Sequence, residues 1–279
     1  MHPIILTCLA MIAFAANSVL CRLALGGELI DPVSYTAFRL VSGVLVLALL
    51  LVLRKGNLRT PVFNGISSVA LFLYAICFSL AYVKLNTATG ALILFGSVQL
   101  TMIGFGIVGG ERLTVSAWVG VFLAGGGLIY LLLPSADAPS LSGAVLMVIS
   151  GFAWGIYSLR GKGAGNSTVV TTWNFIGTVP LTLVAFILVP GDINITMKGA
   201  LLAVVAGGLA SAIGYIIWYS ALPHLGPSRA ATVQLSVPII AALGGILFIN
   251  ESPTLRLFIA GLATLGGIAM VINSKRITS

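Results

Sequence analysis

Residues 81–127 of this chain read AYVKLNTATGALILFGSVQLTMIGFGIVGGERLTVSAWVGVFLAGGG, and residues 221–267 repeat their pattern. At a shift of 140 positions the matched pairs are Ala81 and Ala221, Leu85 and Leu225, Ala91 and Ala231, Gly104 and Gly244, Glu111 and Glu251, Thr114 and Thr254, Gly126 and Gly266, and Gly127 and Gly267. Each copy reads as an apolar helix, a short loop with an acid and a helix-start residue, and a second apolar helix. A repeat of this size determines the fold, so we expect two copies of one membrane unit.

The composition places the chain in a membrane. Of its 279 residues, 59% are hydrophobic and only 7% are charged, whereas a soluble domain carries roughly 25% charged residues. So few charges cannot cover a surface that faces water. The net charge of +8 comes from basic residues in short loops. That distribution is typical of membrane topology and does not indicate a nucleic-acid partner.

The apolar stretches predict ten spans, each near the roughly 20 residues that a bilayer requires. They cover about 4–25, 33–53, 64–83, 87–109, 114–133, 141–159, 168–190, 198–220, 227–249 and 254–273. We therefore expect an all-α integral membrane protein with ten transmembrane helices in two inverted five-helix repeats. The repeats should be residues 1–137 and 138–279, packed as one transmembrane domain. Five crossings are an odd number, so the second copy runs the opposite way, as in many secondary transporters that alternate access.

We expect the first span to be a transmembrane helix and not a cleaved signal peptide, because no Lys or Arg precedes it and an equally apolar span follows. With both termini inside, nine basic residues lie on the inner side and five on the outer side, Arg22 and Arg39 among the five. This excess predicts cytoplasmic termini. Cys8, Cys21 and Cys77 lie in or at the end of spans without metal-ligand spacing, so we expect buried free thiols. We expect no metal and no cofactor.

Motifs in the two halves carry a resemblance to a known family. They are Ala221-Leu222, Ala230-Ala231, Pro238, Glu251-Ser252-Pro253-Thr254, Gly109-Gly110-Glu111-Arg112-Leu113-Thr114, and Phe152-Ala153-Trp154-Gly155 with Tyr157. This pattern resembles the drug/metabolite transporter superfamily in its ten-span form with two EamA-type repeats. One departure is Val98, where the second copy has Pro238. Within the superfamily the chain most resembles aromatic amino acid exporters of the YddG type. That likeness implies an inner-membrane exporter of aromatic and other neutral amino acids. We expect it to be a monomer.

A transport site should lie near the middle of the membrane, between the repeats. Amides deep in the spans either contact the substrate or bond between helices; they are Asn17, Gln99, Asn174 and Gln234. Aromatic residues either line the cavity or belong to the interfacial belt; the candidates are Trp154, Trp173, Trp218, Tyr82 and Tyr157. Pro180 and Pro238 lie inside spans and are either hinges or static kinks.

No Asp or Glu falls in the middle of any predicted span. Glu111 and Glu251 sit at corresponding span ends, where we expect them to help cap the helices that begin after Thr114 and Thr254. An intramembrane carboxylate is the usual proton relay, so we expect transport without obligatory proton coupling.

Other function classes are weighed against this transporter. A membrane enzyme would need a cluster of acids, His or Cys that the spans do not contain. A channel also fits the missing coupling group. Within carriers the rivals are exporters of drugs, nucleotide sugars or other small metabolites. A nucleotide-sugar site needs basic groups in the cavity, and Arg39 is the one basic candidate among the deeper residues.

Overall fold

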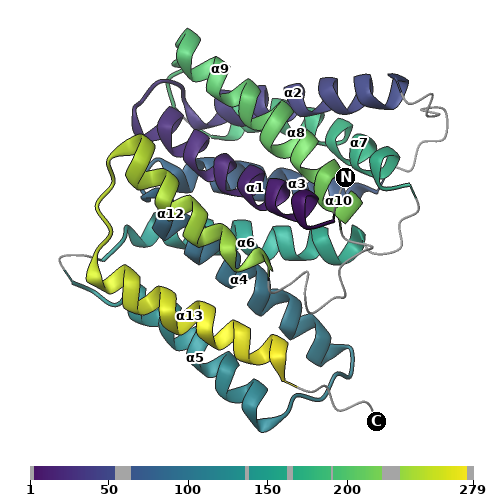
Figure 1. Cartoon of the computed structure of the whole chain (residues 1–279). Helices are drawn as coiled ribbons and strands as arrows, with labels where there is room; N and C mark the ends of the chain where they lie inside the picture. The colour runs from purple at the N-terminus through teal and green to yellow at the C-terminus, as the bar shows by residue number, and fades with distance from the viewer. Residues whose placement is uncertain are drawn as a thin grey trace.

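The computed structural model describes residues 3–53, 64–135, 138–161, 166–189, 191–221 and 233–274. Over these residues the regular structure is helical (Figure 1). Nine helical stretches are long and apolar enough to cross a membrane, and the shorter helix Ser236–Ile249 is a tenth apolar segment within the same described ranges. The predicted ten-span, all-α architecture is therefore confirmed.

The first repeat consists of five continuous helices: α1 (Pro3–Gly26), α2 (Pro32–Leu53), α3 (Gly65–Tyr82), α4 (Thr87–Val108) and α5 (Val115–Leu132). The second repeat is more divided. It consists of α6 (Leu141–Gly161), then α7 (Ser167–Ile176) and α8 (Thr178–Leu188), then α9 (Met197–Val205), the π-helix η1 (Ala206–Ile213) and α10 (Gly214–Ala221), then α12 (Ser236–Ile249) and α13 (Leu255–Asn273).

The duplication is visible in how matching helices begin and end. The Thr114 hydroxyl accepts the N–H of Ala117 at 3.2 Å and starts α5, and the Thr254 hydroxyl starts α13 in the same way. The helix before each start ends in a left-handed residue, with φ of 93° at Gly110 and 59° at Asn250. Both features recur at the shift of 140 positions found in the sequence.

Helices α5 and α13 lie side by side along one edge of the molecule (Figure 1). Their glycines bring the two backbones together. A Cβ at Gly267 would lie 2.5 Å from the carbonyl oxygen of Gly120, and one at Gly127 would lie 3.0 Å from that of Ala260. The two contacts differ by 140 positions on each side, so they are the same contact seen from each copy.

The other helices interlock across the repeats with the same symmetry. Helix α6 packs against α3 and α4. Its counterpart α1 packs against α12 and against the eighth span, which is built from α9, η1 and α10. Helices of each repeat therefore pack against helices of the other, and both repeats line the space between them.

The two hinge candidates, Pro180 and Pro238, each stand just after a helix break. Pro180 has no N–H to offer the carbonyl of Ile176, and α7 ends at that residue. Pro238 lies in the first turn of α12, where a helix tolerates a missing N–H. The breaks thus have a local cause, while their role as hinges stays a prediction.

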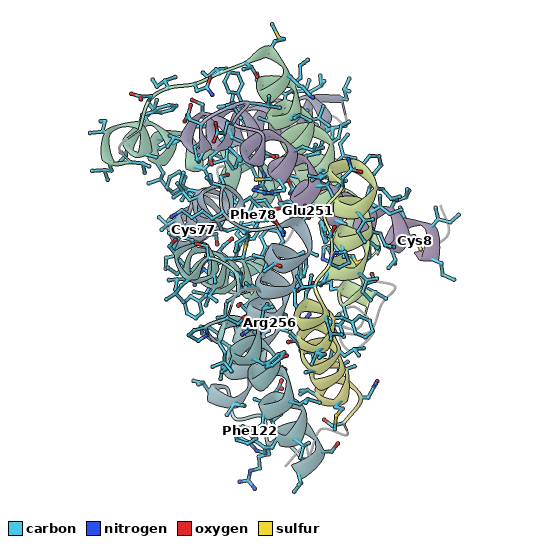
Figure 2. All side chains as sticks on the ribbon, turned by 90° about the vertical axis from the view of Figure 1, so that its left-hand side faces the viewer. Cys8, Cys77, Phe78, Phe122, Glu251 and Arg256 are labelled. Carbon is cyan, nitrogen blue, oxygen red and sulfur yellow. The ribbon has the colours of Figure 1, made fainter. Side chains whose placement is uncertain are left out.

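Exposed apolar side chains cover the outer faces of the bundle, where lipid would surround it. Examples are Leu45, Phe122 and Leu247. The prediction of three buried thiols is right for Cys21 and Cys77 but wrong for Cys8, which is exposed. Figure 2 shows Cys8 on a stretch of α1 that projects from the body of the bundle, so no neighbouring helix covers it.

Candidate functional site

A small cavity lies between the two repeats. The first repeat lines it from α1, α3 and α4, and the second repeat lines it from α6 and α10. Its wall is formed by Phe14, Asn17, Ser18, Tyr74, Phe78, Leu94, Phe95, Trp154 and Tyr215. Six of these nine side chains are aromatic, which suits a planar apolar group better than a polar one.

Trp154 is the centre of an aromatic cluster at this cavity. Its ring centroid lies 4.8 Å from that of Tyr74, 5.0 Å from that of Tyr215 and 5.4 Å from that of Tyr157. The ring planes are tilted at 45°, 46° and 33°, and tilted or edge contacts are favourable for π-systems. Because α3, α6 and α10 each contribute, a movement of one repeat against the other would reshape this cluster.

A polar network adjoins the aromatic wall. The Asn17 amide donates from Nδ2 to the hydroxyl of Ser211 at 3.1 Å, and Arg39 donates from Nε to the same hydroxyl at 3.2 Å. Arg39 also donates from Nη2 to the phenolic oxygen of Tyr74 at 2.9 Å. Asn17 and Tyr74 line the cavity, so the network connects the cavity to Arg39.

Arg39 is the residue least expected in this setting. The topology count places Arg39 on the outer side. The structure places it well inside α2, with a side chain that is 1% exposed. The guanidinium carbon lies 5.2 Å from the ring centroid of Tyr74 and 4.9 Å from that of Phe78. Within the described ranges it forms no ion pair with an acid, and its Nη1 has no hydrogen-bond partner. Buried membrane charges of this kind mark substrate pathways.

The predicted site residues fall into three groups. Asn17 and Trp154 line the cavity. Tyr82, Tyr157 and Trp218 belong to the surrounding aromatic contacts, through Phe78, Trp154 and Phe14 respectively. The remaining candidates do not line this cavity: Gln99 on α4, Trp173 and Asn174 on α7, and Gln234 just before α12.

Several residues that line the cavity are not among the sequence candidates, although the positions of Tyr74 and Phe78 follow a recognisable pattern. Tyr74, Phe78 and Tyr82 are spaced four apart, which places three rings on one face of a helix. Ser211 and Tyr215 have the same spacing but begin inside the π-helix, where standard helical periodicity fails. Arg39 was visible as a lone cation inside an apolar stretch.

The end of the molecule predicted to face outward is tied together by Arg22 and Glu251. Their side chains form an ion pair at 3.3 Å. Arg22 also donates to the carbonyl of Tyr82, where α3 ends. The Glu251 carboxylate accepts the N–H of Thr87 at 2.8 and 3.0 Å, at the start of α4.

The expectation that Glu251 helps to cap the helix after Thr254 is therefore wrong. Thr254 caps that helix with its own hydroxyl. The carboxylate instead reaches the first N–H of α4, because the Asn86 side chain makes no capping bond there and a helix N-terminus attracts negative charge.

Two loops at the same end are also bonded to each other. The N–H of Asp31 donates to the carbonyl of Asn194 at 2.8 Å, and the N–H of Thr196 donates to that of Leu29 at 2.9 Å. These bonds join the loop between α1 and α2 to the loop between α8 and α9. Together with the Arg22–Glu251 pair, they join the two repeats at this end of the molecule.

Comparison with known proteins places this architecture. A family model described as the EamA-like transporter family matches residues 1–133 and again residues 141–273. An uncharacterized protein of Pseudomonas aeruginosa is 49% identical over 275 residues, which are 98% of this chain and 96% of that protein. An uncharacterized transporter of Archaeoglobus fulgidus is 27% identical over 95% of each chain. A solved crystal structure of another protein, 20% identical, has the same fold with a TM-score of 0.65 and covers 94% of this chain and 96% of that one.

Proposed function

Because this chain belongs to the EamA-like transporter family, we propose that it carries aromatic and other neutral amino acids across the inner membrane by alternating access. The family match supports a membrane transporter, and the choice of substrate is our inference from the cavity. The observation that carries it is the aromatic wall centred on Trp154, placed between the two repeats. Offset and edge contacts with a substrate ring contribute about 0.5–1.5 kcal/mol each beyond area burial.

A passive carrier is the mode that the charges favour. The acids that the structure describes all lie outside the spans, at helix ends or in loops. They are Glu28, Asp31, Glu111, Asp192 and Glu251. A proton relay needs a carboxylate or histidine inside the membrane. We therefore propose that substrate moves down its own gradient without obligatory proton coupling.

The fixed positive charge of Arg39 also separates this proposal from the multidrug alternative. A cationic drug in the cavity would lie near the buried guanidinium behind Tyr74 and Phe78, which the described acids do not neutralise. Two positive charges repel strongly in the low dielectric of a membrane interior. We propose cytoplasmic termini as well, since Arg39 lies inside α2 and no longer counts among the outer loop charges.

Transport in proteoliposomes tests the proposal. Purified protein should take up L-tryptophan saturably and stereoselectively, and an imposed pH gradient should leave the rate unchanged. Trp154→Ala should shift the preference from aromatic to smaller amino acids. Trp118→Ala is the matched control, because Trp118 is exposed on the outer face of α5. Uptake that requires a pH gradient, or no uptake of any neutral amino acid, would overturn the proposal.

A further inference from the structure

We propose that Arg39 binds the carboxylate of the substrate, and that the site requires this carboxylate but not an amino group. The substrate class would then be aromatic or apolar monocarboxylic acids, of which amino acids are one kind. The inference rests on the proposed function in one respect, namely that the cavity between the repeats is the substrate site.

The first step is the position of the guanidinium. Arg39 lies directly behind Tyr74 and Phe78, at 5.2 and 4.9 Å from their ring centroids, and both rings line the cavity. A change in the rotamer of either ring would open the cavity to the guanidinium. The rings of Tyr74 and Phe78 are therefore all that separates the guanidinium from a molecule that would occupy the cavity.

The second step is that Arg39 has unused binding capacity. Nε and Nη2 donate to the neutral hydroxyls of Ser211 and Tyr74, and Nη1 has no partner. A buried cation without a counter-ion is unfavourable. Guanidinium and carboxylate match in geometry and form two parallel hydrogen bonds, so a substrate carboxylate would supply the charge that the described protein lacks here.

The third step concerns the amino group. The cavity offers it the neutral Oδ1 of Asn17, which has no hydrogen-bond partner, and the hydroxyl of Ser18. No described acid lies on the cavity wall. An ammonium group thus gains only neutral acceptors and ring faces, whereas a carboxylate gains a full ion pair. Loss of the amino group should cost far less affinity than loss of the carboxylate.

A set of three ligands separates these contributions. L-phenylalanine carries both groups, 3-phenylpropionate lacks the amino group, and L-phenylalaninamide lacks the carboxylate. Binding to purified wild-type protein is measured by calorimetry in nanodiscs, without transport. We expect phenylpropionate to bind within about tenfold of phenylalanine, and the amide to bind at least tenfold more weakly than either.

Variants of Arg39 then assign the effect to this residue. Arg39→Gln should remove the preference for carboxylates over the amide, and Arg39→Lys should keep part of it. Arg160→Gln is the matched control, because Arg160 is exposed at the end of α6. If Arg39→Gln does not fold, Tyr74→Phe serves instead. It removes the hydroxyl that positions Nη2 and should weaken the two acids but not the amide.

The outcomes separate this inference from the proposed function. Equal binding of the amide and the acids, or unchanged acid binding in a folded Arg39→Gln protein, would overturn the inference while leaving amino acid transport intact. Arg39-dependent acid binding by a protein that moves no amino acid into liposomes would keep the inference and overturn the proposed function.

Discussion

The two repeats agree at the ends of their helices and differ in the middle of the membrane. At the ends, Thr114 and Thr254 start matching helices, and Gly110 and Asn250 finish the helices before them. In the middle, the first repeat has continuous helices that carry Arg39. The second repeat has a break at Gly177, the π-helix η1 and, within the described residues, a break at Leu235 just before α12.

This comparison indicates that the matched helix ends hold the scaffold, while the residues of the proposed site come from both matched and interrupted helices. The first repeat contributes the fixed charge and the rings of α3 on regular helices. The second contributes Trp154 from the continuous helix α6, Ser211 from the π-helix η1 and Tyr215 from α10, which follows it. Irregular helical segments are frequent at functional sites. The proposed binding site therefore lies where the continuous helices of the first repeat meet the interrupted helices of the second.

The largest effect should come from breaking the matched contact between α5 and α13. In Gly267→Val the new side chain meets the backbone oxygen of Gly120, which cannot yield without moving α5. Overpacking costs about 1–3 kcal/mol, and we expect a loss at or above that range, measured as the thermal midpoint in detergent. Gly266→Val is the control, because a Cβ there meets nothing within 4 Å. Equal losses for the two variants would show that this contact does not hold the repeats together.

The second-largest effect should come from the ion pair between Arg22 and Glu251. Glu251→Gln removes the charge that Arg22 and the N–H of Thr87 share, and hydrogen bonds to a charged group contribute about 1.5–3 kcal/mol. We expect faster outside labelling of Cys21, buried in α1, by a maleimide reagent. Asp192→Asn, in an exposed loop, should leave the rate unchanged. If Cys21 is labelled equally slowly in Glu251→Gln, the ion pair does not control access to it from outside.

A smaller effect is expected from the break between α7 and α8. Pro180→Ala restores an N–H that can donate to the carbonyl of Ile176 and join the two helices. If the break is a hinge, the variant should be more stable and transport several-fold more slowly. Pro32→Ala is the control, because Pro32 is the first residue of α2 and costs that helix no bond. Unchanged transport in Pro180→Ala would make the break a static kink.

The smallest effect should come from exchanging the matched left-handed residues. Asn250→Gly and Gly110→Asn each give one copy the residue of the other, and both residue types accept positive φ. Stability should change by less than about 0.5 kcal/mol. Gly110→Ala should cost about 1–2 kcal/mol, because Ala resists this conformation. A large loss in either exchange would mean that the two helix ends are not equivalent.

Much of the fold could be predicted because it depends on periodic apolar composition and on a long repeat. The spans, their helix starts and the pairing of the two halves all follow from those features. The partner of Glu251 could not be predicted, because the free N-terminus of α4 comes near it only in three dimensions.

The lining of the cavity was predicted only in part, because some of its residues come together only when the helices pack. Asn17 and Trp154 stand out as polar or bulky residues in mid-span, and both line the cavity. Tyr74 and Tyr215 meet Trp154 only after the helices pack. The sequence leaves Arg39 either an outer charge or a basic residue of the cavity, because its burial depends on Ser211 and Tyr74 from other helices.

The most direct test of the inverted architecture uses two positions that the repeat makes equivalent. Arg112 and Ser252 are 140 residues apart, and both are exposed in the loops before α5 and α13. Single cysteines are placed at each in a protein whose own three cysteines have been replaced, and intact cells are treated with an impermeant maleimide. We predict that Ser252→Cys reacts from outside and Arg112→Cys only after permeabilisation. Labelling of both from the same face would contradict the inverted repeat and, with it, the site between the two halves.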